Sequence, residues 1–264
     1  MAVRYEPKGK IAYITLDRPE ALNAFDQAMH LELHDAWTAF RDDPELWVAI
    51  VTGSGDRVFS AGADIKGWGG SEDAGRPHPR GPARHVWETR FDWDLQGGLE
   101  VWKPTICAVN GHCIGEGLTL ALACDLRIAS ERATFQFPEV QIGVPTIAGA
   151  VRAPRVIGLG AALELLLLGD RVDATRAYDM GLVNKVVPHE ELIAEATRWA
   201  ERLARNAPQA MAATKEVAVR AQALSFDDAL RMGETMRRLA TATEDGREGV
   251  RAFREKRTPE YKGI

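Results

Sequence analysis

Apolar residues follow two different periods along this 264-residue chain. In its first part, short runs of apolar and β-branched residues are bounded by Gly, Pro and Asp, a pattern typical of strands in a buried sheet. Apolar residues also recur at helical spacing from Met29 to Phe40, which predicts a helix with Asp26 as its N-cap. The expected strands are residues 11–16, 47–51, 105–109 and 126–129. This alternation predicts an α/β fold with a largely parallel sheet.

Beyond Pro188 the pattern becomes wholly helical. Before Pro188, the apolar run at residues 161–168, which is broken only by Glu164, predicts a core helix. Four helices are then expected, at residues 192–205, 211–223, 226–241 and 244–255. The change of period divides the chain into a core at residues 1–195 and a C-terminal helical region at 196–264.

Two loops rich in small residues each follow a predicted strand. The first is Ser60-Ala61-Gly62-Ala63-Asp64, and the second runs from Asn110 to Gly117 and opens a predicted helix. Small side chains let a ligand oxygen approach peptide N–H groups closely, and the N–H groups of a first helical turn lack intrahelical partners. Together the loops predict two donors for one carbonyl oxygen, as in a thioester that becomes an enolate.

Composition excludes several classes of protein. The net charge is −5, with basic residues interspersed among acidic ones, which argues against a nucleic-acid-binding or anionic-membrane surface. Three cysteines without a CxxC pair argue against a disulfide framework or a zinc site, so we expect no metal and a reducing, cytoplasmic location. The first residues lack the apolar segment of a secretory signal, and no run is long enough for a membrane span.

Motifs spread over nearly the whole chain carry a family resemblance. They are Arg18-Pro19 with Leu22-Asn23-Ala24, residues 59–66, 103–111 and 123–125, Phe137-Pro138-Glu139, Gly181-Leu182-Val183 and residues 252–257. The chain resembles the crotonase superfamily, that is, the enoyl-CoA hydratase/isomerase family. The resemblance implies a spiral of ββα units at residues 1–195, and a helical trimerisation region at 196–264 of a homotrimer or dimer of trimers. It implies an acyl-CoA substrate, whose coenzyme A is part of the substrate, and no separate cofactor.

The resemblance also implies roles for single residues. The N–H groups of Ala63 and Glu116 would form the oxyanion hole, and Glu139 would be the acid/base. Lys66 would lie near the CoA phosphates, whereas Phe253 and Lys256 would reach the CoA nucleotide, often in a neighbouring subunit. Backbone around five residues would hold the pantetheine and adenine, namely Ala21, Leu22, Ala61, Asp64 and Ile65.

The acid–base set departs from that of the family's hydratases, which use two glutamates. Thr119 stands where the first is expected, and its hydroxyl can hydrogen-bond a water but cannot act as a base near neutral pH. Glu139 alone suits a double-bond isomerase. Glu116, on the same helix face as Thr119, is a candidate replacement, unless its side chain faces solvent. A thioester or carbon–carbon bond hydrolase and a CoA-binding paralogue with little activity stay open as alternatives.

Other polar residues are expected to have structural roles. Asp64 is expected to cap or brace its loop, Asp125 to make a structural hydrogen bond, and His112 and His85 to make polar contacts. The cysteines are expected to fill the core. The tryptophans of residues 67–97 either pack on the core or form a wall of the acyl pocket.

Overall fold

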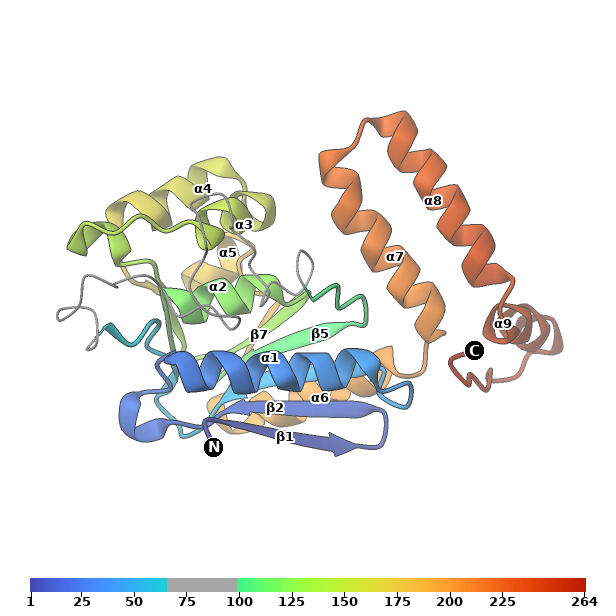
Figure 1. The fold of residues 1–264 in the computed structure, drawn as a ribbon, viewed down its shortest axis with the longest axis horizontal. Coiled ribbons are helices and arrows are strands. Elements are labelled where there is room, and N and C mark those ends of the chain that lie inside the picture. Colours follow the sequence, from blue (N-terminus) through green and yellow to red (C-terminus); the bar gives the residue numbers. More distant parts are fainter. Residues whose placement is uncertain (66–98) are drawn as a thin grey trace.

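Two sheets form the core of a computed structural model that describes residues 1–65 and 99–264, and strands β3 to β8 alternate between them (Figure 1). The larger sheet, in the order β1-β2-β3-β5-β7-β10, is parallel except for the antiparallel pair β1–β2. Its strands are β1 (Val3–Lys8), β2 (Ile11–Leu16), β3 (Val48–Gly53), β5 (Thr105–Val109), β7 (Leu126–Ser130) and β10 (Lys185–Val187). The smaller sheet contains, in order, β4 (Val58–Ser60), β6 (His112–Ile114), β8 (Thr134–Gln136) and β9 (Val172–Asp173).

The pairs β3–β4, β5–β6 and β7–β8 wind as a spiral. In each pair the first strand joins the larger sheet and the second joins the smaller one, in the same order. Helix α2 (Glu116–Ala123) follows β6, and α3 (Ala148–Ile157) follows β8 after the short turn η3 (Glu139–Ile142). The predicted α/β fold, a crotonase-like spiral of ββα units, is thereby confirmed.

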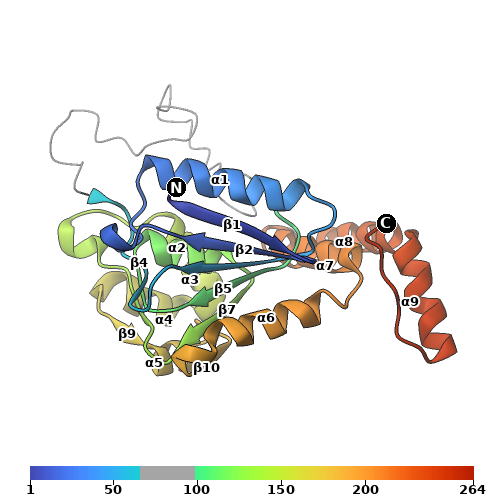
Figure 2. The ribbon, with the colours of Figure 1, turned by 90° about the horizontal axis from the view of Figure 1, so that it is seen from below.

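Helices cover both faces of the larger sheet, which lies between α1 (Gln27–Asp42) and α6 (Leu192–Leu203) (Figure 2). Alternate residues of β3 explain this, because Ala49 and Val51 join the apolar cluster of α1 while Val48 and Ile50 join that of α6. A strand buried on both faces needs a continuous apolar run, as this one has. The Asp26 carboxylate accepts the Met29 N–H at 2.8 Å, so the predicted N-cap of α1 is confirmed.

The predicted core helix at residues 161–168 is only half buried. It is split between α4 (Leu159–Leu163) and a π-helical turn, η4 (Glu164–Leu168). Leu165 and Leu166 are buried, but Leu167 and Leu168 are exposed. The run therefore packs through one face. The remaining short elements of the described residues are η1 (Pro19–Ala21), α5 (Ala174–Asp179), η5 (His189–Glu191) and η6 (Ala221–Ala223).

All three cysteines, Cys107, Cys113 and Cys124, are free and buried, which confirms them as core residues. Burial raises the pKa of the Cys107 and Cys113 thiols well above the usual value, so the reactive thiolate is suppressed. We expect no reaction with a chromogenic disulfide reagent in the folded protein and three thiols per chain in guanidinium chloride. Rapid labelling of the folded protein would contradict this packing.

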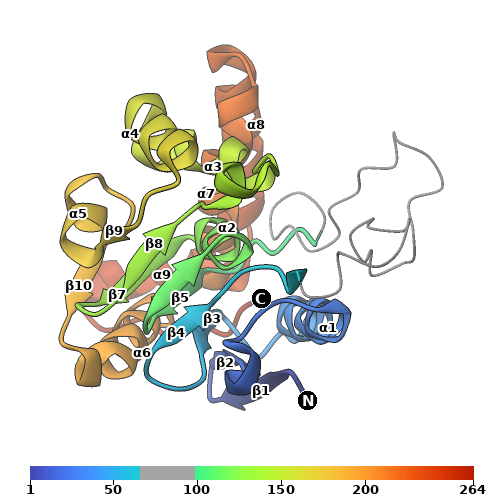
Figure 3. The ribbon, with the colours of Figure 1, turned by 90° about the vertical axis from the view of Figure 1, so that its left-hand side faces the viewer.

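Three further helices form an arm that leaves the sheet: α7 (Pro208–Arg220), α8 (Phe226–Thr241) and α9 (Glu244–Glu255) (Figures 1 and 3). The bounds of α8 and α9 match the sequence prediction. Helix α6 contacts β3, β5 and β7, although the sequence grouped most of it with the helical region. The division at residue 195 stays a prediction.

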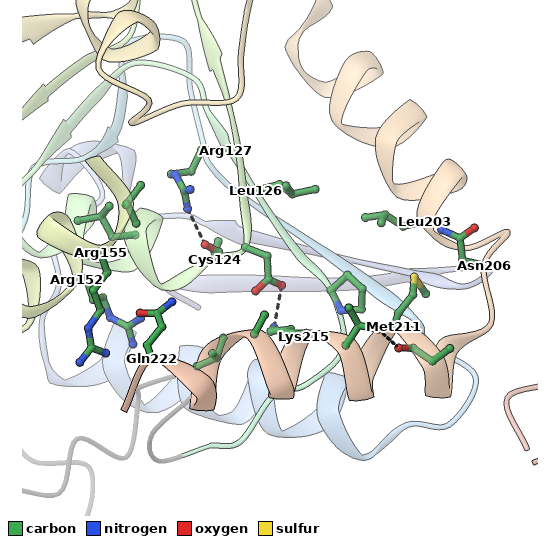
Figure 4. Close-up of a pocket in the computed structure, with 18 of the residues that line it drawn as sticks. Cys124, Leu126, Arg127, Arg152, Arg155, Leu203, Asn206, Met211, Lys215 and Gln222 are labelled. Carbon is green, nitrogen blue, oxygen red and sulfur yellow. Dashed lines mark hydrogen bonds and ion pairs between the residues drawn. The ribbon is translucent and has the colours of Figure 1, made fainter. Parts of the chain in front are cut away.

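A cavity of about 1000 Å³ separates α7 from the core (Figure 4). None of the described residues that line it is a predicted site residue. The Lys215 ammonium crosses from α7 to the Asp125 carboxylate at 2.8 Å and also donates to the Lys103 carbonyl at 2.9 Å. The same Asp125 oxygen accepts the Thr105 N–H at 2.7 Å, as its predicted structural role requires. This network attaches the arm to the core.

Lys215→Met is expected to lower the free energy of unfolding by about 2 kcal/mol, because it leaves a partly buried carboxylate without its cation. Arg220→Met is the matched control on the same helix, since the Arg220 side chain is 41% exposed where it pairs with Glu216 and Glu100 and stacks on Trp102. Arg220→Met should lower the free energy of unfolding by less than about 1 kcal/mol. Urea unfolding measures the free energy of unfolding of both variants. Equal losses in the two would contradict the role of Lys215 in attaching the arm to the core.

Candidate active site

The first wall of the candidate site is the start of α2. Gly115, whose φ of +53° favours glycine, turns the chain from β6 into the helix. The first helical bond runs from the Thr119 N–H to the Gly115 carbonyl at 3.0 Å, so the Glu116 N–H lies before the intrahelical ladder begins. The N-cap residue, Gly115, has no side chain that could cap this terminus. It therefore presents N–H donors and the positive end of the helix dipole.

The second wall is the loop after β4, held by a parallel bridge between Phe25 and Ala63. The Phe25 N–H donates to the Gly62 carbonyl at 2.8 Å, and the Asp64 N–H donates to the Phe25 carbonyl at 2.9 Å. Because N–H groups alternate in direction along an extended segment, the Ala63 N–H points away from this bridge.

The two walls touch at their glycines. A Cβ on Gly62 would lie 2.9 Å from the Ile114 carbonyl oxygen and 3.4 Å from the Glu116 nitrogen. A Cβ on Gly117 would lie 2.7 Å from that of Ser60. Only glycine allows this approach, which brings Ala63 beside the first turn of α2.

Glu139 lies at the same place, at the start of η3. The strand before it is fixed by the Gly115 N–H, which donates to the Gln136 carbonyl at 2.9 Å. One carboxylate oxygen of Glu139, Oε1, lies 3.1 Å from where a Cβ of Gly115 would be. The other, Oε2, is buried and has no hydrogen-bond partner within the described part of the chain. A buried polar atom without a partner needs an explanation.

The Glu116 side chain is held by a histidine that the sequence prediction did not single out. His30 Nε2, on α1, lies 2.9 Å from Glu116 Oε1. A lone histidine on a largely apolar helix face resembles a core residue, and its partner is 86 residues away in sequence. Nothing in the sequence pairs the two. Thr119 lies on the turn after Glu116 and is partly exposed.

Most of the residues predicted to hold CoA form one strip beside the second wall. The Ala61 N–H donates to the Leu22 carbonyl at 3.0 Å, which joins the loop to Ala21 and Leu22. Asp64 braces the loop as expected, through an ion pair with Arg18 at 3.4 Å, and Ile65 is exposed. Lys66, His85 and the tryptophan-rich segment lie outside the described residues.

Phe253 and Lys256 are not brought to this strip by their own chain. They belong to α9 and its C-cap, at the opposite end of the long axis from β4 (Figure 2). Phe253 is 85% exposed, which is unusual for a large aromatic side chain.

Comparison with known proteins identifies the chain. A model of the family described as enoyl-CoA hydratase/isomerase matches residues 6–264. The chain belongs to this family. Its similarity to (E)-benzylidenesuccinyl-CoA hydratase of Thauera aromatica is 34% identity and covers all of both chains. It is 38% identical to carnitinyl-CoA dehydratase of Salmonella arizonae, over 99% of this chain and 98% of that protein.

Solved structures of the family agree with the fold. A crystal structure of enoyl-CoA hydratase from Bacillus anthracis matches with a TM-score of 0.87 at 33% identity and covers 100% of both chains. The chain is thus an enzyme of the lyase or isomerase type that acts on CoA thioesters. Within residues 1–65 and 99–264 no helix is long and apolar enough to cross a membrane. The same residues contain no cluster of three side chains that could hold a metal ion.

Proposed function

We propose that this family member reversibly hydrates 2-enoyl-CoA thioesters. In this proposal the N–H groups of Ala63 and Glu116 hold the thioester oxygen, and Glu139 moves the proton at the α-carbon. Relatives that match nearly the whole chain are named as a hydratase and a dehydratase of CoA compounds, which supports water as the group added or removed.

The buried Oε2 of Glu139 carries the proposal. Leaving a carboxylate oxygen buried without a donor costs free energy unless a ligand uses it. Here the carboxylate lies against Gly115, beside the N–H donors of α2. A group so placed can exchange a proton with a carbon next to a carbonyl held by those donors.

Isomerisation of the double bond is the second candidate. It needs only one carboxylate, and Thr119 supplies none at the position where the family's hydratases carry a glutamate. Hydration passes through a 3-hydroxy enolate and isomerisation through a dienolate, but both place negative charge on the thioester oxygen, so the oxyanion hole does not distinguish them.

The decisive assay supplies 2-enoyl-CoA and 3-enoyl-CoA separately and identifies the products by mass spectrometry. We expect a 3-hydroxyacyl-CoA from the 2-enoyl substrate. Conversion of the 3-enoyl substrate without any hydration would support the isomerase instead. Tight CoA binding with no turnover of either substrate would leave a CoA-binding paralogue.

We also propose that the enzyme is a homotrimer or a dimer of trimers in which Phe253 and Lys256 contact CoA bound to a neighbouring subunit. The distance of α9 from β4 and the exposure of Phe253 support this arrangement. Light scattering gives the oligomeric state, and Phe253→Ala is expected to raise the KM for acyl-CoA more than it lowers kcat.

A further inference from the structure

Water addition needs a second acid–base group, because one proton leaves the water while another joins the α-carbon. Glu139 serves the α-carbon in the proposed function, and Thr119 cannot take the proton of water. The nearest carboxylate on the same helix is Glu116, one turn before Thr119 and on the same face. Its backbone N–H is also a proposed oxyanion donor, so its side chain starts beside the thioester.

The Glu116 carboxylate is held by His30 and is partly exposed. His30 Nε2 lies 2.9 Å from Oε1, and the side chain of Glu116 is 28% exposed whereas that of His30 is 9% exposed. His30 is itself held in place, since its ring packs on Phe25 with centroids 5.4 Å apart. A partly exposed carboxylate that is held by a buried hydrogen-bond donor has the geometry of a positioned base.

Two oxygen atoms lie within hydrogen-bonding distance of the His30 ring nitrogens. Nδ1 lies 3.3 Å from the Asp26 carbonyl oxygen, which can only accept a hydrogen bond. Nε2 faces the carboxylate, also an acceptor when ionised. A ring protonated on both nitrogens satisfies both, and a neutral ring with its proton on Nε2 still holds Glu116. The hydrogen bond between His30 Nε2 and Glu116 is therefore compatible with either proton state of the ring.

We propose that the His30–Glu116 pair is the second acid–base group of the site and takes the proton of the water that adds to the β-carbon. This inference rests on the proposed hydratase function and deepens it. Glu116 is the catalytic residue, and His30 positions it and shares its proton.

The step balances as follows. The water oxygen bonds to the β-carbon, the π electrons of the Cα=Cβ bond pass into the enolate, and one water proton goes to the Glu116 carboxylate. The enolate electrons then form a C–H bond at the α-carbon with the proton of the Glu139 carboxyl group. Afterwards Glu139 regains a proton from solvent and the pair releases one, so the net change is addition of one water. Dehydration is the reverse.

Two reactions of the full-length enzyme separate this role from a structural one. Hydration of 2-butenoyl-CoA needs both groups, whereas exchange of the α-protons of butanoyl-CoA with D₂O, followed by NMR, needs only the oxyanion donors and Glu139. Glu116→Gln keeps the backbone donor, and His30→Gln keeps a side-chain donor that cannot take a proton. We expect Glu116→Gln to lower hydration at least about 100-fold and His30→Gln at least about 10-fold, with exchange within about threefold of the wild type.

His34→Gln is the matched control, one turn further along α1, and should change neither reaction. Unchanged hydration in Glu116→Gln or His30→Gln would overturn the inference alone. Equal loss of hydration and exchange would also overturn it, since the pair would then only shape the site. A wild-type enzyme that exchanges α-protons but hydrates no 2-enoyl-CoA would overturn the proposed function and this inference together.

Discussion

Glu139→Gln is expected to lower both hydration of 2-enoyl-CoA and α-proton exchange by between about 100-fold and 10,000-fold. The amide has nearly the shape of the carboxylate but cannot carry a proton to or from carbon. Because Oε2 has no partner among the described residues, the substitution breaks no structural hydrogen bond at that atom. Folding and CoA affinity should therefore stay close to those of the wild type.

The control for this variant is Glu131→Gln, in the exposed turn that follows β7. It should keep full activity. Calorimetric titration with CoA and a thermal melt show whether the Glu139 variant is intact. A folded Glu139→Gln variant that retains more than about a tenth of the wild-type rate would remove Glu139 from its role.

Gly62→Ala is expected to lower kcat by about 100- to 1,000-fold, the loss that follows removal of one oxyanion donor. The added methyl group would lie 2.9 Å from the Ile114 carbonyl oxygen, so the loop and the start of α2 must move apart. That movement separates the N–H groups of Ala63 and Glu116. The φ of +90° at Gly62 adds a conformational cost of about 1–2 kcal/mol in stability.

Gly55→Ala isolates the two effects, because its φ of +79° is similar and nothing lies within 4 Å of the added Cβ. Gly62→Ala should lose more stability than Gly55→Ala in urea unfolding, because only its methyl group also meets the Ile114 carbonyl, and only Gly62→Ala should lose turnover. Equal losses of turnover would mean that backbone strain, and not the oxyanion hole, sets the effect.

Long elements with a clear period were predictable from the sequence. The helix capped by Asp26 and the helices at residues 226–241 and 244–255 appear where expected. The strands of the smaller sheet have only two or three residues, too few to show a period. Strand β1 carries charged residues and a proline on an edge, a composition that does not resemble a buried strand.

The candidate site was predictable only where glycines or motifs marked it. The approach of Gly62 to α2 could be expected from small residues in two loops, and Glu139 from its motif. The contact between His30 and Glu116 joins α1 to α2 through tertiary packing alone, and no local pattern carries that information.

The central claim is that backbone N–H groups of the two loops polarise a thioester carbonyl. The most direct test is the infrared C=O stretch of an acyl-CoA labelled with ¹³C at that carbonyl, bound to the inactive Glu139→Gln variant. The account predicts a stretch at lower frequency than for the free thioester, restored towards the free value when Gly62→Ala is added. A bound carbonyl that absorbs at the free frequency, or a shift that Gly62→Ala leaves unchanged, would contradict it.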